Sequence, residues 1–206
     1  MTQISDVPSR YRGKYPPACL YVRGNYQPEI PAVAIVGTRA CSDYGREVAS
    51  WFASFLVENG IAIISGLARG IDSVAHLSAL ESGGITYAVL GCGVDSPYPV
   101  TNEWLADRIV ASNGAILSEY EPGTPPSPKG LALRNRIIAG LSDALIVVEA
   151  PQRSGALIAA DFAKKAGVPV GAVPGKITSQ TSAGTYLLIS EGARMITHPG
   201  DILHML

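Results

Sequence analysis

Residues 33–60 read VAIVGTRACSDYGREVASWFASFLVENG, and they contain the unit from which the rest of the sequence is built. A short β-branched run comes first, a glycine turn follows, and a segment with the period of a helix completes the unit. In that segment Val48, Phe52 and Leu56 fall on one apolar stripe, which predicts an amphipathic helix. Gly60 then ends the helix, because glycine adopts a left-handed conformation easily.

The same alternation continues to the end of the sequence. It predicts strands over 33–36, 61–64, 86–90, 115–117, 144–149, 169–173 and 194–196. It predicts helices over 44–58, 72–82, 102–112, 134–141, 154–166, 184–190 and 201–206. Alternating strands and helices are typical of right-handed crossovers between parallel strands. We therefore expect an α/β protein with a doubly wound, mostly parallel, extended Rossmann-like sheet and helices on both faces.

The composition agrees with a folded protein of ordinary size. The chain has 206 residues, of which 47% are apolar and 16% charged, and its net charge is −1. Such a chain is long enough for a self-sufficient core and too apolar for a disordered protein. We expect one domain over 31–206, preceded by an irregular lead-in, 1–30, that packs on it. Near neutrality excludes a uniformly basic coat for nucleic acid, but it allows a local basic patch.

Cysteine usage and hydropathy point to the cytoplasm. Cys19, Cys41 and Cys92 are scattered and form no metal-binding or disulfide pattern. The N-terminus, 1–15, is polar, and no apolar run of the sequence approaches the length of a membrane span. We therefore expect a cytoplasmic protein with reduced thiols, no membrane association and no metal site.

Small, hydroxyl-bearing and basic residues follow nearly every predicted strand. The carboxyl ends of parallel strands meet at the edge of the sheet where ligands bind. Glycine lets a backbone approach a ligand, the free N–H groups of a helix start attract anions, and Arg or Lys adds positive charge. This edge predicts a phosphate-binding rim, with the candidates Gly37, Arg39, Ser65, Gly66, Arg69, Ser154, Gly155 and Lys176. The alternative for any single loop is a glycine that serves only the turn.

The stretch 122–142 contains no acidic residue but three basic ones, Lys129, Arg134 and Arg136. Its first part, 122–130, is rich in proline and is expected to be a loop over the edge of the sheet. Arg134 and Arg136 then open a helix, where positive charge opposes the helix dipole unless an anion is bound. The alternative is a solvated basic turn. The phosphate-binding candidates of this stretch are Lys129, Arg134, Asn135 and Arg136.

Catalytic constellations are sparse. Glu119 and Glu149 follow strands, and we expect them to orient Arg134 or Arg39 through paired hydrogen bonds. The alternative for these carboxylates is general acid–base chemistry on a glycosidic bond. His76 has apolar neighbours in a predicted helix, which favours a packed histidine over a catalytic base.

Signatures of nucleotide cofactors are incomplete. Gly91-Cys92-Gly93 begins a Gly-x-Gly-x-x-Gly pattern, but Ser96 stands where the third glycine is needed, and the sequence contains no P-loop motif. We therefore expect no cofactor. Asp72 is expected to cap its helix.

Several strand-end motifs occur together in this sequence. They are Gly37-Thr38-Arg39, Ser65-Gly66-Leu67-Ala68-Arg69-Gly70-Ile71-Asp72, Gly91-Cys92-Gly93-Val94-Asp95, Ser118-Glu119-Tyr120, Arg134-Asn135-Arg136 and Pro174-Gly175. Over about residues 15–200 the sequence thereby resembles the DNA-processing protein A family (DprA, also called Smf). The resemblance implies an extended Rossmann fold that binds single-stranded DNA, protects incoming strands in natural transformation and loads the RecA recombinase onto them. It also implies a homodimer and no catalytic activity.

Carried over by position, the resemblance implies a DNA pocket at Arg39, the Ser65-Gly66 turn, Lys129 and Arg134. The sequence departs from the family at Leu131-Ala132, where many members have an aromatic-proline pair. Tyr186 and Ala159 stand where the family often has Asn and Thr. The resemblance does not extend to the helical and winged-helix domains that flank this region in many members.

Two other functions stay open on the residues alone. One is a phosphoribohydrolase-type enzyme, in which Glu149 and Arg134 would form the catalytic pair, although the Pro-Gly-Gly-x-Gly-Thr-x-x-Glu motif of those enzymes is missing. The other is a sensor of a small nucleotide.

The C-terminus is unusually apolar. We expect its side chains to pack in a subunit interface, in a RecA contact or on the core of the same chain. The residues concerned are Ile202, Leu203, Met205 and Leu206.

Overall fold

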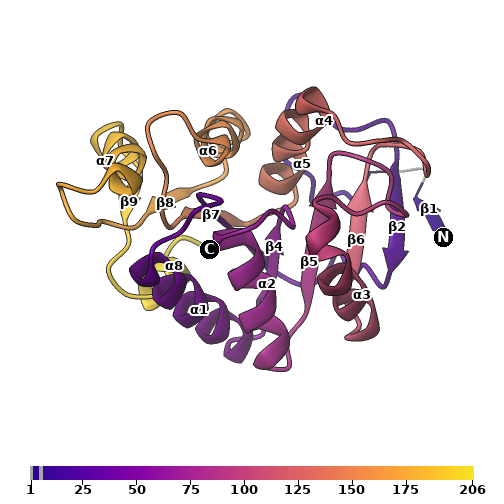
Figure 1. Ribbon diagram of the computed structural model, residues 1–206, viewed down its shortest axis with the longest axis horizontal. Coiled ribbons are helices and arrows are strands. Elements are labelled where there is room, and N and C mark those ends of the chain that lie inside the picture. Colours follow the sequence, from indigo (N-terminus) through magenta and orange to yellow (C-terminus); the bar gives the residue numbers. More distant parts are fainter. Residues whose placement is uncertain (1, 5–6) are drawn as a thin grey trace.

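Fully buried apolar runs form the centre of the sheet. They are β3 (Ala32–Val36), β4 (Ala62–Ser65), β5 (Thr86–Leu90), β6 (Ala115–Ser118) and β7 (Ala144–Val147). These strands pair in parallel in the order β6-β5-β4-β3-β7, and β8 (Val170–Ala172) and β9 (Arg194–Met195) extend the sheet in parallel beyond β7. The computed structural model, which describes residues 2–4 and 7–206, thus confirms a doubly wound, mostly parallel sheet (Figure 1).

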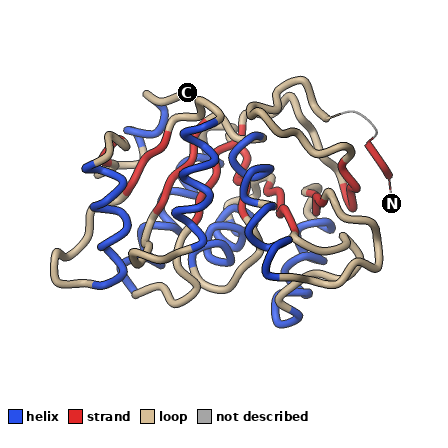
Figure 2. Tube along the Cα trace, turned by 90° about the horizontal axis from the view of Figure 1, so that it is seen from above, coloured by secondary structure: helices blue, strands red, loops and turns tan. Residues whose placement is uncertain are grey.

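The first part of the chain is more regular than predicted. Within the segment 1–30, β2 (Leu20–Gly24) pairs antiparallel with β6, and β1 (Thr2–Ile4) pairs antiparallel with β2. Leu20 and Val22 are buried and alternate with less buried residues, as expected for an antiparallel strand with one face on the core. Figure 2 shows the N-terminus at one end of the molecule beside these strands. The expectation of an irregular lead-in was therefore wrong for this part.

Helices cover both faces of the sheet (Figures 1 and 2). One face packs against α1 (Asp43–Glu58), α2 (Ile71–Glu81), α3 (Glu103–Ala111) and α8 (Gly200–Leu203). The other face packs against α5 (Asn135–Gly140), α6 (Gly155–Lys165) and α7 (Ala183–Ser190). Single 3-10 turns, Val100–Asn102 and Gln180–Ser182, precede α3 and α7. In the part of the chain that the structure describes, no helix is long and apolar enough to cross a membrane.

A further helix, α4 (Pro128–Leu133), begins inside the segment predicted to be a loop. The Ser127 hydroxyl accepts a hydrogen bond from the backbone N–H of Gly130 at 3.0 Å and caps the helix. Proline fits the first turn, where its missing N–H leaves no hydrogen bond unmade. The loop predicted over 122–130 therefore ends at Ser127.

The apolar C-terminus packs mainly on the core of its own chain. Ile202 is fully buried, and Leu203 and Met205 are partly buried against the cluster that α1 forms with β3. Leu206 alone of the four residues is largely exposed, at 51%. Core packing therefore accounts for three of the four residues.

Two neighbouring residues on α3 test whether the buried face of this helix belongs to the core. Leu105 is fully buried, whereas Trp104 is 53% exposed. We expect Leu105→Ala to lower the free energy of unfolding by about 2–5 kcal/mol, because it removes buried methyl groups and leaves a cavity. Trp104→Ala should change it by no more than about 0.5 kcal/mol. Urea denaturation of both variants measures the difference, and equal losses would contradict the assignment.

Candidate nucleic-acid interface

A groove lies at the carboxyl edge of the sheet, where the strand order reverses between β3 and β7. Its main cavity has a volume of about 380 Å³, and a smaller cavity of about 120 Å³ lies beside it. The two cavities form one groove, because both are lined by Arg39, Ala68, Leu131 and Arg134. Such reversal points are where open α/β sheets bind ligands.

Three exposed arginines surround the groove. Arg39 follows β3, Arg69 follows β4 and Arg153 follows β7, and each lines at least one of the two cavities. No carboxylate of the described residues lies within ion-pair distance of these three guanidinium groups. The one carboxylate that the described residues contribute to the lining, Asp72, is only 6% exposed. The surface that the groove presents is therefore cationic.

The N-terminus of α6 opens into the groove. Ser154 caps this helix, and its hydroxyl accepts a hydrogen bond from the N–H of Ala156 at 3.2 Å. Ser154, Gly155 and Ala156 all line the main cavity, and the first turn contains no acidic residue. The free N–H groups and the dipole of such a helix end favour an anion.

The N-terminus of α1, in contrast, is occupied by Glu149. This carboxylate is 3% exposed and accepts hydrogen bonds from the Ser42 N–H at 2.9 Å, the Ser42 hydroxyl at 2.7 Å and the Thr181 hydroxyl at 2.9 Å. We had expected Glu149 to orient Arg134 or Arg39. Its hydrogen bonds show that it orients neither arginine. Glu119 does not do so either, because it pairs with Arg136.

Arg134 forms the floor of the groove rather than its rim. It is 5% exposed, and its Nη1 donates to the carbonyls of Gly66 and, at 3.0 Å, Val89. Burial lowers the pKa of Arg134, and the nearby charge of Asp72 offsets part of that effect. An arginine stays protonated across the physiological range, so a positive charge is fixed beneath the groove.

Asp72 supports the turn after β4 instead of capping its own helix. It follows the cap residue Gly70 by two positions, and its carboxylate accepts from the N–H groups of Gly66 at 3.2 Å and Ala68 at 3.4 Å. Burial raises the pKa of Asp72, although Arg134 and these N–H groups favour its charged form. Asp72 thus holds the loop that carries Arg69.

Close packing explains the Ser65-Gly66 turn. A Cβ atom on Gly66 would lie 2.5 Å from Nη2 of Arg134 and 2.9 Å from Asp72, so no larger residue fits there. The Ser65 hydroxyl is fully buried and donates to the carbonyl of Ile35 at 2.6 Å. Both residues therefore shape the site without facing a ligand.

The structure brings together some of the predicted site residues and separates others. Gly37, Arg39, Arg69, Arg134, Asn135, Ser154 and Gly155 line the groove. The amide of Asn135 donates to the carbonyl of Gly155 at 3.2 Å and so connects α5 with α6. Lys129 on α4 and Lys176 after β8 are exposed but line neither cavity, and Arg136 lines a different one.

Among the lining residues that were absent from the predicted site, Arg153 and Tyr98 have side chains suited to a nucleic acid. Arg153 directly precedes Ser154, and its place after a predicted strand was the available signal. Tyr98 is 38% exposed and lines the smaller cavity with Arg39 and Arg69. Tyr98 supplies an aromatic ring to a groove in which Leu131 is aliphatic.

His76 is packed, as predicted, and lies fully buried in the middle of α2. The Thr86 hydroxyl donates to the carbonyl of Ile63 at 2.9 Å, so it must accept the 2.6 Å hydrogen bond from Nδ1–H of His76. The Nε2 atom has no partner among the described residues. Burial, with a smaller effect of Arg134, lowers the pKa of His76 to about 3, so the ring is neutral.

This pKa predicts acid sensitivity. The unfolded chain, with a histidine pKa of about 6.5, takes up a proton before the folded chain does. The stabilising contribution of neutral His76 is full above about pH 6.5 and is lost as the pH falls toward 3. Between about pH 7 and pH 5 we expect His76 to account for a loss of roughly 2 kcal/mol.

Denaturant unfolding at the two pH values measures this loss. His76→Leu should remove it, whereas His204→Gln, at an exposed position, should retain it. An unchanged pH dependence in His76→Leu would contradict the assignment.

Comparison with known proteins shows which family the chain belongs to. The family model of DNA recombination-mediator protein A matches residues 4–206. The putative DNA processing protein DprA of Mycobacterium tuberculosis is 46% identical over 172 residues, which are 84% of this chain and 44% of that protein. The chain spans about half the length of most of the curated relatives it matches.

Two solved structures superpose closely. DNA processing protein A from Streptococcus pneumoniae gives a TM-score of 0.91 at 41% identity, covering 98% of this chain and 73% of that one. The same protein from Helicobacter pylori, for which a single-stranded DNA binding mode is described, gives 0.89 at 32% identity and covers 98% and 94%. The agreement of sequence, fold and strand-end motifs leads to one conclusion: the chain belongs to the DNA recombination-mediator protein A family.

Proposed function

We propose that the groove binds the backbone of single-stranded DNA. The observation that carries the proposal is the set of exposed arginines, Arg39, Arg69 and Arg153, which lack carboxylate partners in the described residues and line the two adjoining cavities of one groove. Such cations and the N–H groups of α6 suit phosphates, which carry most of the affinity in sequence-independent binding. The single-stranded DNA binding mode described for the Helicobacter pylori relative supports the proposal.

Tyr98 gives the proposed site a surface for a base. Aromatic rings beside a cationic groove stack bases of any sequence. Tyr98 borders the same small cavity as Arg39 and Arg69, so a base on its ring would leave the adjoining phosphates close to these two cations. This arrangement favours a strand whose bases are unpaired over a duplex.

A glycosidic-bond hydrolase fits the geometry less well. The carboxylate that such an enzyme would need, Glu149, is buried and accepts three hydrogen bonds from Ser42 and Thr181. It does not line the groove. We therefore propose a binding protein without catalytic activity of this kind. In the role that the family resemblance implies, it would act in the cytoplasm, protect incoming strands and load RecA onto them.

Charge reversal in the groove tests DNA binding. Arg39→Glu or Arg153→Glu should weaken binding of a single-stranded oligonucleotide of about 20 bases by about tenfold or more and lower its dependence on salt. Tyr98→Ala should weaken binding by a similar factor with an unchanged salt dependence, because it removes stacking instead of charge. A gel-shift salt series with single- and double-stranded DNA measures both effects.

Arg108→Glu is the matched control. Arg108 is exposed in the last turn of α3 and lines neither cavity of the groove, so the same change of charge should leave binding unaltered. Equal weakening in all the charge variants, or binding independent of salt, would refute the proposed site. Release of free base from a nucleoside monophosphate would instead indicate the hydrolase.

A homodimer is the second part of the proposal. Large apolar side chains are exposed on consecutive elements at the β9 end of the sheet: Met195 on β9 is 53% exposed, Leu187 on α7 44% and Ile177 after β8 87%. Apolar side chains gathered in this way favour association. We expect Met195→Glu to convert a dimer to a monomer in light scattering, whereas Trp104→Glu on α3 leaves it intact. A dimer that survives Met195→Glu would exclude this surface.

A further inference from the structure

A second cavity lies away from the groove, between the N-terminal segment and helices α5 and α6. Its volume is about 460 Å³, and residues 11–15 form one wall. Arg136 of α5 and Phe162 and Lys165 of α6 contribute to the rest of the lining. None of these residues lines either cavity of the groove. A cavity of this volume is large enough for a small organic ligand.

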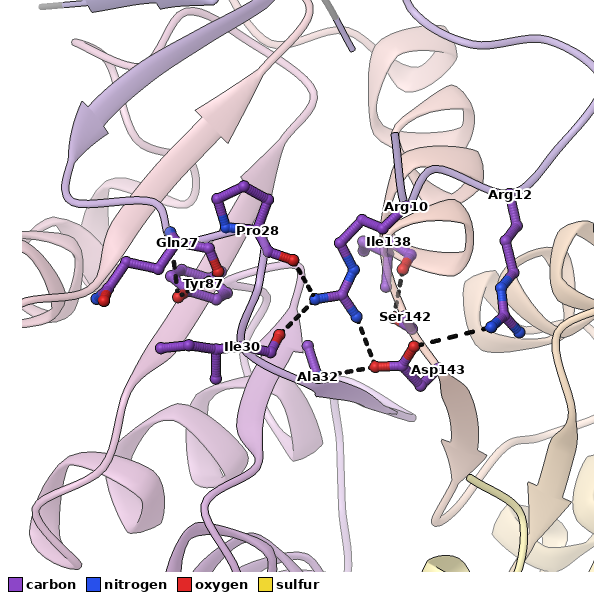
Figure 3. A network of polar contacts seen from close by, with 10 residues as sticks. All are labelled: Arg10, Arg12, Gln27, Pro28, Ile30, Ala32, Tyr87, Ile138, Ser142 and Asp143. Atoms are coloured by element: carbon purple, nitrogen blue, oxygen red, sulfur yellow. Dashed lines mark hydrogen bonds and ion pairs between the residues drawn. The ribbon is translucent and has the colours of Figure 1, made fainter. Parts of the chain in front are cut away.

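The wall of this cavity is held in place by a polar network (Figure 3). Arg10 donates to Asp143 at 2.5 Å and to the carbonyl of Pro28 at 2.8 Å, and Asp143 also accepts from the N–H of Ala32 at 2.9 Å. The N–H of Arg12 donates to the carbonyl of Gly140 at 2.7 Å. The segment is therefore fixed to the starts of β3 and β7 and to the end of α5, and the cavity is preformed.

Gly140 is required for this attachment. A Cβ atom at that position would collide with the ring of Tyr11 and would lie 2.5 Å from the carbonyl oxygen of Arg12. The Tyr11 hydroxyl in turn donates to the carbonyl of Tyr15 at 3.1 Å, which closes the segment into a turn. Backbone and ring contacts thus set the shape of the wall.

The lining combines aromatic rings with positive charge. Tyr11, Tyr15 and Phe162 supply the rings, and no carboxylate of the described residues borders the cavity. Lys14 lies 5.5 Å from the centre of the Tyr15 ring, and it forms no ion pair with a described residue. Arg12 is half exposed, and its ion pair with Asp143 is long, at 4.0 Å. The Lys14 ammonium and the exposed part of the Arg12 guanidinium can therefore meet an anion.

Arg136 adds a partly buried charge with spare hydrogen-bonding capacity. It pairs with Glu119 through Nη2, while its Nη1 has no partner among the described residues. Arg134 is the cap residue of α5 and Arg136 lies in its first turn, yet the two arginines of the Arg-Asn-Arg motif line different cavities. The Arg-Asn-Arg motif therefore contributes one arginine to the groove and one to the second cavity.

We propose that this cavity binds a nucleotide, either free or as one unit of a DNA strand that extends beyond the groove. The base would lie against the rings of Tyr11, Tyr15 or Phe162, and the phosphate would meet Arg12 and Lys14. Aromatic rings bind bases by stacking, and neighbouring cations bind the phosphate, so the lining matches both parts of a nucleotide. The proposal does not depend on DNA binding in the groove.

Calorimetric titration with deoxyadenosine monophosphate tests the free nucleotide. Tyr15→Ala and Lys14→Glu change exposed side chains and should each weaken binding by about tenfold, the equivalent of one stacked base or one phosphate contact. Arg108→Glu on α3 should leave this binding unchanged, and Arg39→Glu reports any nucleotide that binds in the groove instead. Circular dichroism confirms that each variant is folded.

Photocrosslinking tests the strand. A single-stranded oligonucleotide of about 20 bases that contains bromodeoxyuridine should crosslink to the peptides with Tyr11, Tyr15 or Phe162, and Lys14→Glu should reduce this yield. Nucleotide binding that is lost in Tyr15→Ala, or crosslinks to these peptides, supports the proposal for the free or the strand form respectively. Nucleotide binding lost only in Arg39→Glu without these crosslinks, or neither signal, would overturn it.

Discussion

One buried guanidinium group connects the parts of the groove. Arg134 lies where α4 meets α5, and its hydrogen bonds reach the turn after β4 and the last part of β5. A charge in this position is costly to bury unless hydrogen bonds and an opposite charge compensate it. The carbonyls of Gly66 and Val89 and the nearby Asp72 provide this compensation. The loop that carries the exposed Arg69 is therefore held in part by a residue that hardly reaches the surface.

The nearly neutral chain presents a cationic site because its carboxylates are unevenly placed at the strand ends. Carboxylates of the protein occupy the strand-end loops that lead into α1 and α2, with Glu149 bonded to Ser42 and Asp72 to Gly66 and Ala68. The start of α6 has no such carboxylate in its first turn. Carboxylates of the protein thus neutralise the positive ends of some strand–helix connections, and the start of α6 is left available for an external anion. The net charge of −1 hides this arrangement.

The fold was predictable because the central strands are continuous apolar runs separated by turn residues. β2 was missed because five alternating residues between proline- and glycine-rich flanks are a weak signal, and α4 because proline was taken as a breaker although it fits a first turn. The site was predictable only as an edge of the sheet. Arg134 and Arg136 are two residues apart in the sequence, and only the packing of α5 decides that one lies under the groove and the other beside Glu119.

The position of β3 has a consequence for the order in which the molecule can fold. On one side Val33 pairs with Ile63, which is nearby in the sequence, but on the other it pairs with Ala144. Contacts between residues so far apart cost chain entropy and slow the search for the native state. During synthesis the half of the sheet from β3 to β6 can assemble first, with one side of β3 unpaired until β7 leaves the ribosome. The groove, which lies across that last seam, is therefore completed late.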